Sequence, residues 1–573
     1  MKVILTTLNS KYIHTSLALA YLEAACRCPD WELEVCEFTI NENLEDIMTS
    51  IYQTRADVIC FSTYIWNIEK ILTICRDYKK VAPLCTIILG GPEVSYDAAQ
   101  VLTANPDVDY VVVGEGEATL KELLEKLDRK EPVTDIKGIS YRQNDRIQVN
   151  LPRPVIEDLD VLASPINKDL TDYKERVVYY ETTRGCPFNC AYCLSSASKG
   201  VRYFPLERVK NELKHVLGYQ LRELKLVDRT FNYNERRARE IMQFIIEQKS
   251  KTKVHLEICA DILSESFMDF LSQVPPDIFN FEIGVQSTYL PTLRAVNRFS
   301  NWERLKKNIL TIKSFRNIHL HLDLIAGLPL ESYSRFQMSF NDVYHLQPHM
   351  LQLGFLKLLK GSLIYRKRKE HDYCFQSHPP YQILSNRYIS YDEIIRLKQI
   401  EKVLNRYYNA GITPSTLDYV INSIYDGNAF KFFEELALYW ERNELFSIGH
   451  RREKQYDILL EFLNYLYPDK REVFNELIKF DFLSRNLPHH FPEKVIRHQT
   501  DTNRELLYNC LENKVFKELP VLPRGSKREL LKYLHLEYFT INPFNLKSIH
   551  QLFPLLFIYD PTKKRALKIL VVS

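Results

Sequence analysis

The sequence predicts an α/β protein: an N-terminal doubly wound, Rossmann-like domain, a central partial (β/α)6 barrel of the TIM type, and a mainly α-helical C-terminal domain. Two stretches, residues 1–140 and 176–370, alternate short apolar runs with helical patterns. Strands separated by helices pair in parallel and form sheets covered on both faces. Beyond residue 370 this alternation stops. We therefore expect three domains, with residues 141–175 connecting the first two.

The first domain is expected to bind a ligand at one edge of its sheet. Apolar runs predict its strands at residues 3–7, 33–38, 57–63, 86–91 and 110–117. In such parallel sheets the ligand crevice lies at the carboxyl ends of the strands. Small or hydrogen-bonding residues stand at these ends: Ser10, Ser62, Tyr64, Gly90, Gly91, Glu115 and Gly116. Any one pair would suit an ordinary turn, but their recurrence predicts a crevice. No GxGxxG motif follows the first strand, so the dinucleotide fingerprint is missing.

The connection at residues 141–175 is expected to be a hairpin followed by a linker. GISYR and RIQVN flank Gln143-Asn144-Asp145, a turn sequence between two short strands. The next stretch, LPRPVIEDLDVLASP at residues 151–165, contains three prolines and is typical of a linker.

The barrel is predicted from six further apolar runs, at residues 177–183, 223–228, 253–259, 279–286, 318–327 and 350–358. Three of them, KVHLEIC, FNFEIGVQ and IHLHLDLIAG, alternate polar with apolar residues. A period of two places the polar groups on one face of each strand. An antiparallel sheet with one wet face would show the same pattern. Because intervening helices must cover the apolar face, we expect the polar face to line the barrel lumen, where a polar ligand would satisfy it.

Residues 371–573 are expected to form the helical domain. FFEELALYWE, QYDILLEFLNYLY and VFNELIKFDFL carry amphipathic helical patterns rich in tyrosine and phenylalanine. These patterns indicate packing and point to no particular chemistry.

Composition excludes several classes of protein. The chain has 76 basic and 73 acidic residues, so no broad basic field predicts nucleic-acid binding. No apolar run approaches the length of a membrane span, and MKVILTTLNSKYIHTS is typical of a first strand rather than a signal peptide. Nine of the twelve cysteines are scattered without framework spacing, which does not indicate a secreted disulfide scaffold. We expect a cytoplasmic protein that binds no membrane.

Three cysteines, Cys186, Cys190 and Cys193, lie close together in RGCPFNCAYC at residues 184–193. A structural zinc site needs four ligands, usually as two short knuckles, and no second C-x-x-C is present. A redox dithiol needs only two cysteines, which leaves Cys186 unexplained. Three thiolates on one loop suit a [4Fe–4S] cluster with one iron open to an external ligand.

The motif Cys-x3-Cys-x2-Cys directly after the first barrel strand, with an aromatic residue before the last cysteine, resembles the radical S-adenosylmethionine (SAM) superfamily. TIILGGPEVSY and DYVVVGEGEATL resemble the cobalamin-binding domain that precedes the barrel in one large branch of that superfamily. The whole chain is similar to bacterial B12-binding-domain radical SAM proteins with a C-terminal domain of unknown function. The resemblance implies that residues 1–140 bind cobalamin and that residues 176–370 are the radical SAM core.

The resemblance also implies roles for individual residues. Cys186, Cys190 and Cys193 would hold the cluster, whose open iron would chelate SAM. The family's glycine-rich amine-binding motif is not recognisable, because LVDRTFN stands in its place and offers Asp228 instead. The positions that match SAM contacts are Tyr192, Asp228, Glu257, Gln286, Ser287 and Arg298. The crevice residues of the first domain would contact cobalamin.

The first domain departs from the family at the lower ligand of cobalamin. Domains that supply a histidine carry Asp-x-His-x-x-Gly after the first strand, whereas this chain has LNSKYIHTS. Lys11 takes the place of that histidine, and His14 lies three residues later. His14 as the ligand, cobalamin bound without a histidine, and a vestigial domain all stay open.

The activity that the resemblance implies is reductive cleavage of SAM to a 5′-deoxyadenosyl radical, with methyl transfer from cobalamin to an unactivated carbon. Ring formation or rearrangement without methylation is the alternative enzyme, and a cobalamin or cluster-based sensor is the alternative outside catalysis. A tRNA methylthiotransferase would need a second set of cysteines that the N-terminal domain lacks. A flavodoxin or ferredoxin is the expected electron donor. The substrate is not predicted.

Overall fold

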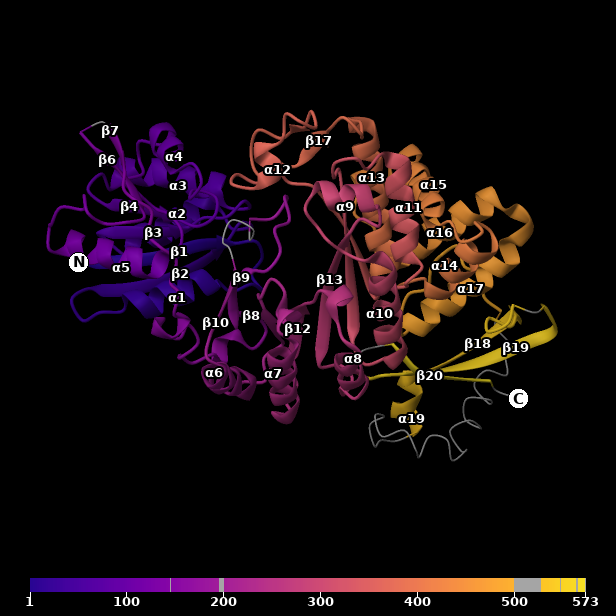
Figure 1. Cartoon of the computed structure of the whole chain (residues 1–573). Helices are drawn as coiled ribbons and strands as arrows, with labels where there is room; N and C mark the ends of the chain where they lie inside the picture. Colours follow the sequence, from indigo (N-terminus) through magenta and orange to yellow (C-terminus); the bar gives the residue numbers. More distant parts are fainter. Residues whose placement is uncertain (145, 195–199, 499–526, 547, 563–564, 572–573) are drawn as a thin grey trace. The chain divides into compact units, whose positions relative to one another are not determined.

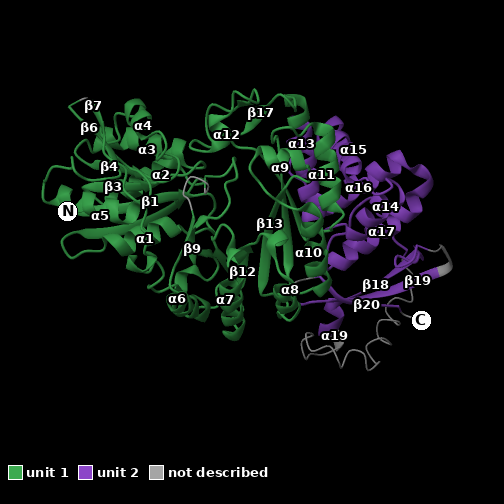
Figure 2. Ribbon diagram, in the orientation of Figure 1, with its two compact units in different colours: residues 1–394 green, residues 395–573 purple. Residues whose placement is uncertain are grey.

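The computed structural model describes residues 1–573 except 145, 195–199, 499–526, 547, 563–564 and 572–573 (Figure 1). Its contacts divide the chain into two compact units, residues 1–394 and residues 395–573 (Figure 2). The first unit contains both sheets that the sequence predicts. Within the described parts of the chain, no helix combines the length and the apolar character needed to cross a membrane.

The N-terminal sheet has the strand order β2-β1-β3-β4-β5-β6-β7. Its first five strands are parallel, and the hairpin β6–β7 adds two antiparallel strands at the edge. The strands are β1 (Lys2–Asn9), β2 (Glu32–Thr39), β3 (Val58–Ser62), β4 (Thr86–Gly90), β5 (Tyr110–Val112), β6 (Ile139–Gln143) and β7 (Arg146–Val149). The hairpin expected at the start of the linker thus extends the first domain.

Helices cover both faces of this sheet, as a doubly wound fold requires. They are α1 (Leu17–Cys26), α2 (Leu44–Gln53), α3 (Ile68–Val81), α4 (Ala98–Ala104) and α5 (Gly116–Asp128). Alternate residues of β1 enter two separate cores: Ile4 packs with residues of α2, α3 and α4, whereas Val3 and Leu5 pack with residues of α1 and α5. Because β5 ends at Val112, Gly114 belongs to the turn into α5 and Gly116 is the first residue of that helix.

The barrel sheet is wholly parallel, with the order β15-β14-β13-β12-β11-β8. Its strands are β8 (Val177–Tyr180), β11 (Glu223–Leu226), β12 (Lys253–Glu257), β13 (Phe279–Gln286), β14 (His319–Ala326) and β15 (Met350–Phe355). Its helices are α6 (Leu206–Gly218), α7 (Glu235–Glu247), α8 (Glu265–Ser272), α9 (Leu290–Ala295), α10 (Trp302–Phe315) and α11 (Tyr333–Tyr344). Every second residue of β13 is buried, and the polar residues between them are half-buried. The alternation of polar and apolar residues along β13 therefore separates a buried apolar face from a half-buried polar face, as predicted.

A small antiparallel hairpin projects from the barrel and carries the first cysteine. It consists of β9 (Thr183–Cys186) and β10 (Gly200–Tyr203), with Gly200 opposite Cys186.

The segment at residues 357–394, with α12 (Leu363–Arg366), β16 (Cys374–Phe375) and β17 (Ile383–Ser385), belongs to the first unit. Tyr381 donates a hydrogen bond to Glu93, and Lys360 pairs with Asp97 at 2.8 Å. Its amide at Ile364 donates to the carbonyl of Ala191 at 2.8 Å, within the cysteine loop. The first unit therefore extends beyond the predicted barrel end at residue 370.

The second unit is built from helices and a three-stranded antiparallel sheet, β18-β19-β20. Its elements are α14 (Pro414–Ser423), α15 (Ala429–Arg442), α16 (Arg452–Leu466), α17 (Arg471–Arg485), α19 (Lys527–Leu530), β18 (Leu534–Ile541), β19 (Ser548–Tyr559) and β20 (Ala566–Val571); α13 (Tyr391–Leu404) leads into it. The three helices predicted here are present. The sheet was not predicted, because β19 contains Pro554 and proline is rare inside strands.

We expect Phe281→Ala to lower the free energy of unfolding by about 3–5 kcal/mol, because its ring is 0% exposed on β13 and the truncation leaves a cavity. Denaturant midpoints measure the change. Phe299→Ala, at a side chain that is 80% exposed, is the matched control and should change the midpoint little. Equal effects of the two substitutions would contradict this packing.

Candidate functional site

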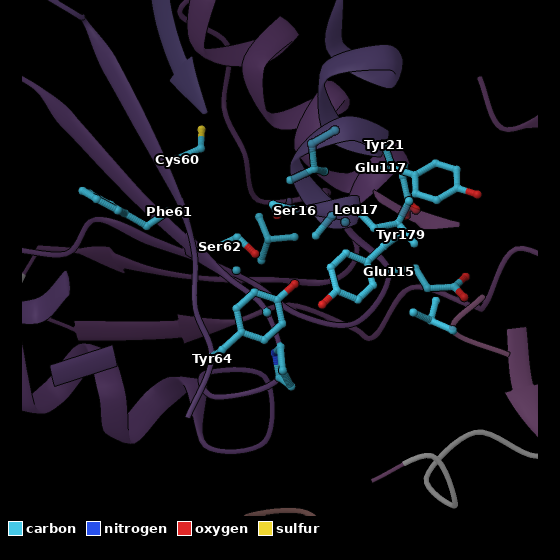
Figure 3. Close-up of a pocket in the computed structure, with 18 of the residues that line it drawn as sticks. Ser16, Leu17, Tyr21, Cys60, Phe61, Ser62, Tyr64, Glu115, Glu117 and Tyr179 are labelled. Atoms are coloured by element: carbon cyan, nitrogen blue, oxygen red, sulfur yellow. The ribbon is translucent and has the colours of Figure 1, made fainter. Parts of the chain in front are cut away.

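A large cavity of about 650 Å³ lies at the carboxyl ends of the N-terminal strands (Figure 3). Its lining includes every residue predicted for the crevice: Ser10, Ser62, Tyr64, Gly90, Gly91, Glu115 and Gly116. Residues of the barrel complete the lining, among them Tyr179 on β8 and Arg229 after β11. The structure thus brings the predicted residues together, and their contacts with cobalamin stay predictions.

The wall of the large cavity combines glycine backbone with flat aromatic rings. Gly91 has a φ of +111°, and a Cβ atom there would lie 2.4 Å from the carbonyl oxygen of Thr63, so only glycine fits. A Cβ at Gly114 would meet nothing within 4 Å, which leaves its backbone open to the cavity. Tyr64 and Trp66 stack with centroids 4.5 Å apart and 4° between their planes. Such a wall fits a large, flat ligand.

His14 lines the large cavity but already has one partner. Its Nδ1 lies 2.7 Å from the Tyr179 hydroxyl oxygen, which leaves Nε2 for another ligand. Burial, together with the positive charge of Lys11, lowers the pKa of His14 below 6.5. A neutral imidazole is the form that ligates metals, so the structure is compatible with a ligand role and does not assign one.

An ion-pair network joins the N-terminal domain to the hairpin that carries Cys186. Arg184 on β9 pairs with Glu117 at 2.5 Å and with Glu181 at 2.8 Å. Arg202 on β10 pairs with Glu115 at 2.6 Å. Although burial raises the pKa of Glu115, hydrogen bonds from Arg202 and from the Ile156 amide hold it below its ordinary value. The predicted cobalamin residue Glu115 is therefore an ionised partner of the hairpin.

A second, smaller cavity of about 180 Å³, here called the cysteine cavity, lies at the mouth of the barrel. It is lined by the three cysteines, by four of the predicted SAM residues, and by neighbours that lie in the cysteine loop, just after β11 and β12, or on β13 and β14: Cys186, Cys190, Cys193, Tyr192, Glu257, Gln286, Arg298, Phe188, Arg229, Thr230, Ile258, Cys259, Glu282, Gly284 and Asp323. The cysteine loop is fixed by its backbone, because Ala191 donates to Val296 and accepts from Ile364, both at 2.8 Å. The loop therefore presents the cysteines from a defined position.

The cysteine cavity offers three thiols with a cationic donor beside them, a donor set that fits an iron–sulfur cluster. Among the residues that the structure describes, no three His, Cys, Asp or Glu side chains converge closely enough to hold one ion. The thiolates of an iron–sulfur cluster bind different irons and need no common centre. Arg298 Nη1 donates to Cys190 Sγ at 4.0 Å and to the Tyr192 hydroxyl at 3.4 Å. A cationic donor beside a thiolate stabilises its charge.

Glu257 and Gln286 supply polar groups to the cysteine cavity. Burial raises the pKa of Glu257 to about 7, while the charge of Arg229 lowers it. Gln286 has a φ of +69°, and its buried Oε1 has no partner among the described residues. A Cβ atom at Gly284 would lie 2.1 Å from the Gln286 amide nitrogen, so glycine makes room for that side chain. An unpaired buried acceptor is a site for a bound donor.

Two predicted SAM residues lie outside the described linings. Asp228 is 0% exposed and accepts from the amide of Thr182 at 3.0 Å and from the hydroxyls of Thr182 and Thr183 at 2.6 Å. Ser287 is 1% exposed and donates to Glu331 at 2.6 Å. In this structure both side chains form hydrogen bonds within the protein, Asp228 with Thr182 and Thr183 and Ser287 with Glu331, and their contacts with SAM stay predictions.

The sequence reasoning missed Arg229, which lines both cavities. The large cavity and the cysteine cavity therefore adjoin at this residue. Only its place next to Asp228, at the carboxyl end of a barrel strand, could have drawn attention to it.

Three family models match consecutive parts of the chain. The model of the B12 binding domain matches residues 3–124, and the model of the radical SAM superfamily matches residues 180–343. A third model, DUF4080, describes proteins of unknown function and matches residues 369–552. The chain is a B12-binding-domain radical SAM protein. The models confirm the predicted fold class, and the B12 binding and radical SAM domains agree with the predicted cofactors cobalamin and SAM; the [4Fe–4S] cluster at Cys186, Cys190 and Cys193 stays a prediction.

Curated relatives of the B12-binding radical SAM chain include methyltransferases. An uncharacterized methyltransferase of Pyrococcus horikoshii is 24% identical over 431 residues, which cover 72% of this chain and 91% of that protein. The 2-(S-pantetheinyl)-carbapenam-3-carboxylate methyltransferase of Streptantibioticus cattleyicolor is 28% identical over 306 residues, 50% of this chain and 44% of that protein. The chain thus spans less than half of the second relative.

Among solved structures, the cobalamin-dependent SAM radical enzyme OxsB with aqua-cobalamin bound is similar with a TM-score of 0.56 and 14% identity. The match covers 84% of this chain and 81% of OxsB. At this identity the likeness shows a shared fold alone.

We expect Gly185→Ala to reduce cluster loading. Gly185 has a φ of +96°, and a Cβ atom there would lie 2.2 Å from the Gly200 carbonyl oxygen, so the hairpin next to Cys186 must open. Iron and acid-labile sulfide per chain after reconstitution measure the effect. Gly218→Ala, where a Cβ meets nothing within 4 Å, is the control. Full loading of both variants would contradict a positioning role for the hairpin.

We also expect Glu331 to make stability fall as the pH rises. Burial raises the pKa of Glu331 from 4.5 to about 7 despite hydrogen bonds from Ser287 and Ser339. Between these values the folded chain binds more protons than the unfolded chain, so folding is favoured below this window and loses up to about 3 kcal/mol above it. Unfolding midpoints at about pH 5 and about pH 8 should show this loss for the wild type and less for Glu331→Gln.

Glu370→Gln, at a side chain that is 60% exposed, is the control for the pH effect. Equal pH dependence of the wild type and both variants would show that Glu331 does not carry it.

Proposed function

We propose that the protein is a cobalamin-dependent radical SAM methyltransferase that places a methyl group on an unactivated carbon. The observation that carries this proposal is that the cysteine cavity and the large cavity share Arg229 in their linings. A methyl acceptor held where they meet could reach both cofactors. Three methyltransferase relatives match at least 50% of this chain, whereas three ring-forming cyclases match 19–27% of it, so coverage favours methylation over ring formation.

The cofactors would supply the difficult chemistry: when bound, the reduced cluster and SAM provide a radical that removes a hydrogen atom, and cobalamin provides the methyl group. The chain's own residues would position the cofactors and stabilise the charge of the thiolates that bind the cluster. Cys186, Cys190 and Cys193 hold the cluster, and Arg298 stabilises the Cys190 thiolate through its hydrogen bond. The Arg184 and Arg202 ion pairs keep the cysteine hairpin against the N-terminal domain. We also propose a cytoplasmic flavodoxin or ferredoxin as the electron donor.

The products distinguish methylation from its alternatives. Anaerobically reconstituted protein, given a reductant, SAM, cobalamin and host extract, should form both 5′-deoxyadenosine and S-adenosylhomocysteine. Loss of the Cys193 ligand in Cys193→Ala should reduce SAM cleavage by at least about a hundredfold, because the cluster loses one of its three protein ligands. Chromatography of the nucleoside products measures both.

Cys28→Ala, at a half-buried cysteine bonded to Asp30, is the matched control and should cleave SAM as the wild type does. 5′-Deoxyadenosine without S-adenosylhomocysteine would favour ring formation or rearrangement. If neither the wild type nor Cys193→Ala cleaves SAM, the proposal that the protein is a radical SAM enzyme is wrong.

A further inference from the structure

Arg229 stands at the boundary of the two cavities on a rigid loop. The residue before it, Asp228, is fully buried and tied to Thr182. Three residues later, Asn232 is also 0% exposed, and its side-chain amide exchanges two 2.8 Å hydrogen bonds with the backbone of Cys259. The backbone on either side is therefore held to two neighbouring segments of the barrel. The position of Arg229 is set by the fold rather than by contacts of its own side chain.

The guanidinium of Arg229 has no protein partner in the described structure. Its backbone carbonyl accepts from Thr230, but no hydrogen bond or ion pair joins its side chain to another described residue. The carboxylates of the large cavity contact other arginines: Glu117 and Glu181 share Arg184, and Glu115 pairs with Arg202. Arg229 is exposed and makes no direct ion pair with any of these carboxylates.

Charges on the side of the cysteine cavity do not neutralise Arg229 by contact. Glu282 is paired with Lys225 at 2.8 Å and with His255 at 2.7 Å. Glu257 forms no hydrogen bond or ion pair with Arg229 and feels only its charge, while burial raises the pKa of Glu257 to about 7. Arginine offers several N–H donors in a planar fork that matches carboxylate and phosphate groups. A solvent-exposed guanidinium that lines both cavities and contacts no carboxylate directly is suited to such an anion.

We propose that Arg229 binds an anionic group, a carboxylate or a phosphate, of the methyl acceptor, and therefore that the substrate class is small anionic molecules. This inference rests on the proposed function, because it assumes an acceptor held between the two cofactors. Arg298, which touches Cys190 and Tyr192, already supplies a cation on the cluster side. Arg229 is left for a molecule at the boundary, where the acceptor has to lie.

The first test measures anion binding directly. Reconstituted holoprotein is dialysed to equilibrium against radiolabelled inorganic phosphate. We expect the wild type to bind phosphate, Arg229→Lys to bind more weakly, and Arg229→Gln to lose at least about tenfold in affinity. Arg236→Gln, at an α7 arginine that is 92% exposed, is the matched control. No phosphate bound by the wild type, or equal binding by Arg229→Gln, would overturn the proposal.

The second test separates the acceptor from the cofactors as the source of the anion. SAM and cobalamin affinities of Arg229→Gln should stay within about twofold of the wild type. A tenfold loss for SAM would assign Arg229 to the SAM carboxylate, and the same loss for cobalamin would assign it to the cobalamin phosphate. Either result would overturn the assignment to the acceptor.

The third test follows methyl-labelled SAM into host metabolites separated by anion exchange. Label is expected in the acidic fraction, and Arg229→Gln should reduce it at least about tenfold while still cleaving SAM. Label confined to neutral compounds would overturn the proposal. If the wild type cleaves no SAM, the proposed function fails, and phosphate dialysis still decides whether Arg229 is an anion site.

Discussion

The arrangement of the first unit depends on the buried ion pairs that Arg184 and Arg202 make with the N-terminal domain. Arg184 reaches Glu117 on α5, and Arg202 reaches Glu115 at the start of that helix. Both arginines belong to the β9–β10 hairpin, whose first strand ends at Cys186. Removing Arg184 would leave the largely buried carboxylates of Glu117 and Glu181 without their cation, which is far more costly than losing a surface pair. The same contact therefore fixes the position of a predicted cluster ligand and closes one side of the large cavity.

The polar face of the barrel strands is the second constraint. Half-buried polar residues alternate with fully buried apolar ones along β13 and β14. In the lumen these polar groups satisfy one another, as in the contacts of Glu282 with Lys225 and His255. The groups near the mouth, Gln286 and Arg298, each retain an unpartnered buried atom. Polar side chains such as Glu282 are thus paired with one another deeper in the lumen, whereas the unpartnered atoms of Gln286 and Arg298 at its mouth are available to a ligand.

Much of this architecture is predictable because strand periodicity and cofactor motifs are local signals. The period of two in β13 and β14 and the spacing of the cysteines can be read without knowing the fold. The pairing of Glu115 with Arg202 joins residues far apart in the chain, so no local pattern indicates it. Ser287 and Asp228 illustrate the converse case: their positions suggest a ligand, but tertiary neighbours use their side chains. Arg229 was missed because its place in the linings of both cavities depends on the tertiary structure.

The hydrogen bond from Ile364 to Ala191 has a consequence for the maturation of the protein. Ala191 lies between two predicted cluster ligands, yet its backbone partner comes from a segment beyond the last barrel strand. During synthesis the cysteines leave the ribosome long before that segment does. Residues 357–394 can therefore support the cysteine loop only after the whole barrel has been synthesised, so this backbone contact depends on a late part of the first unit.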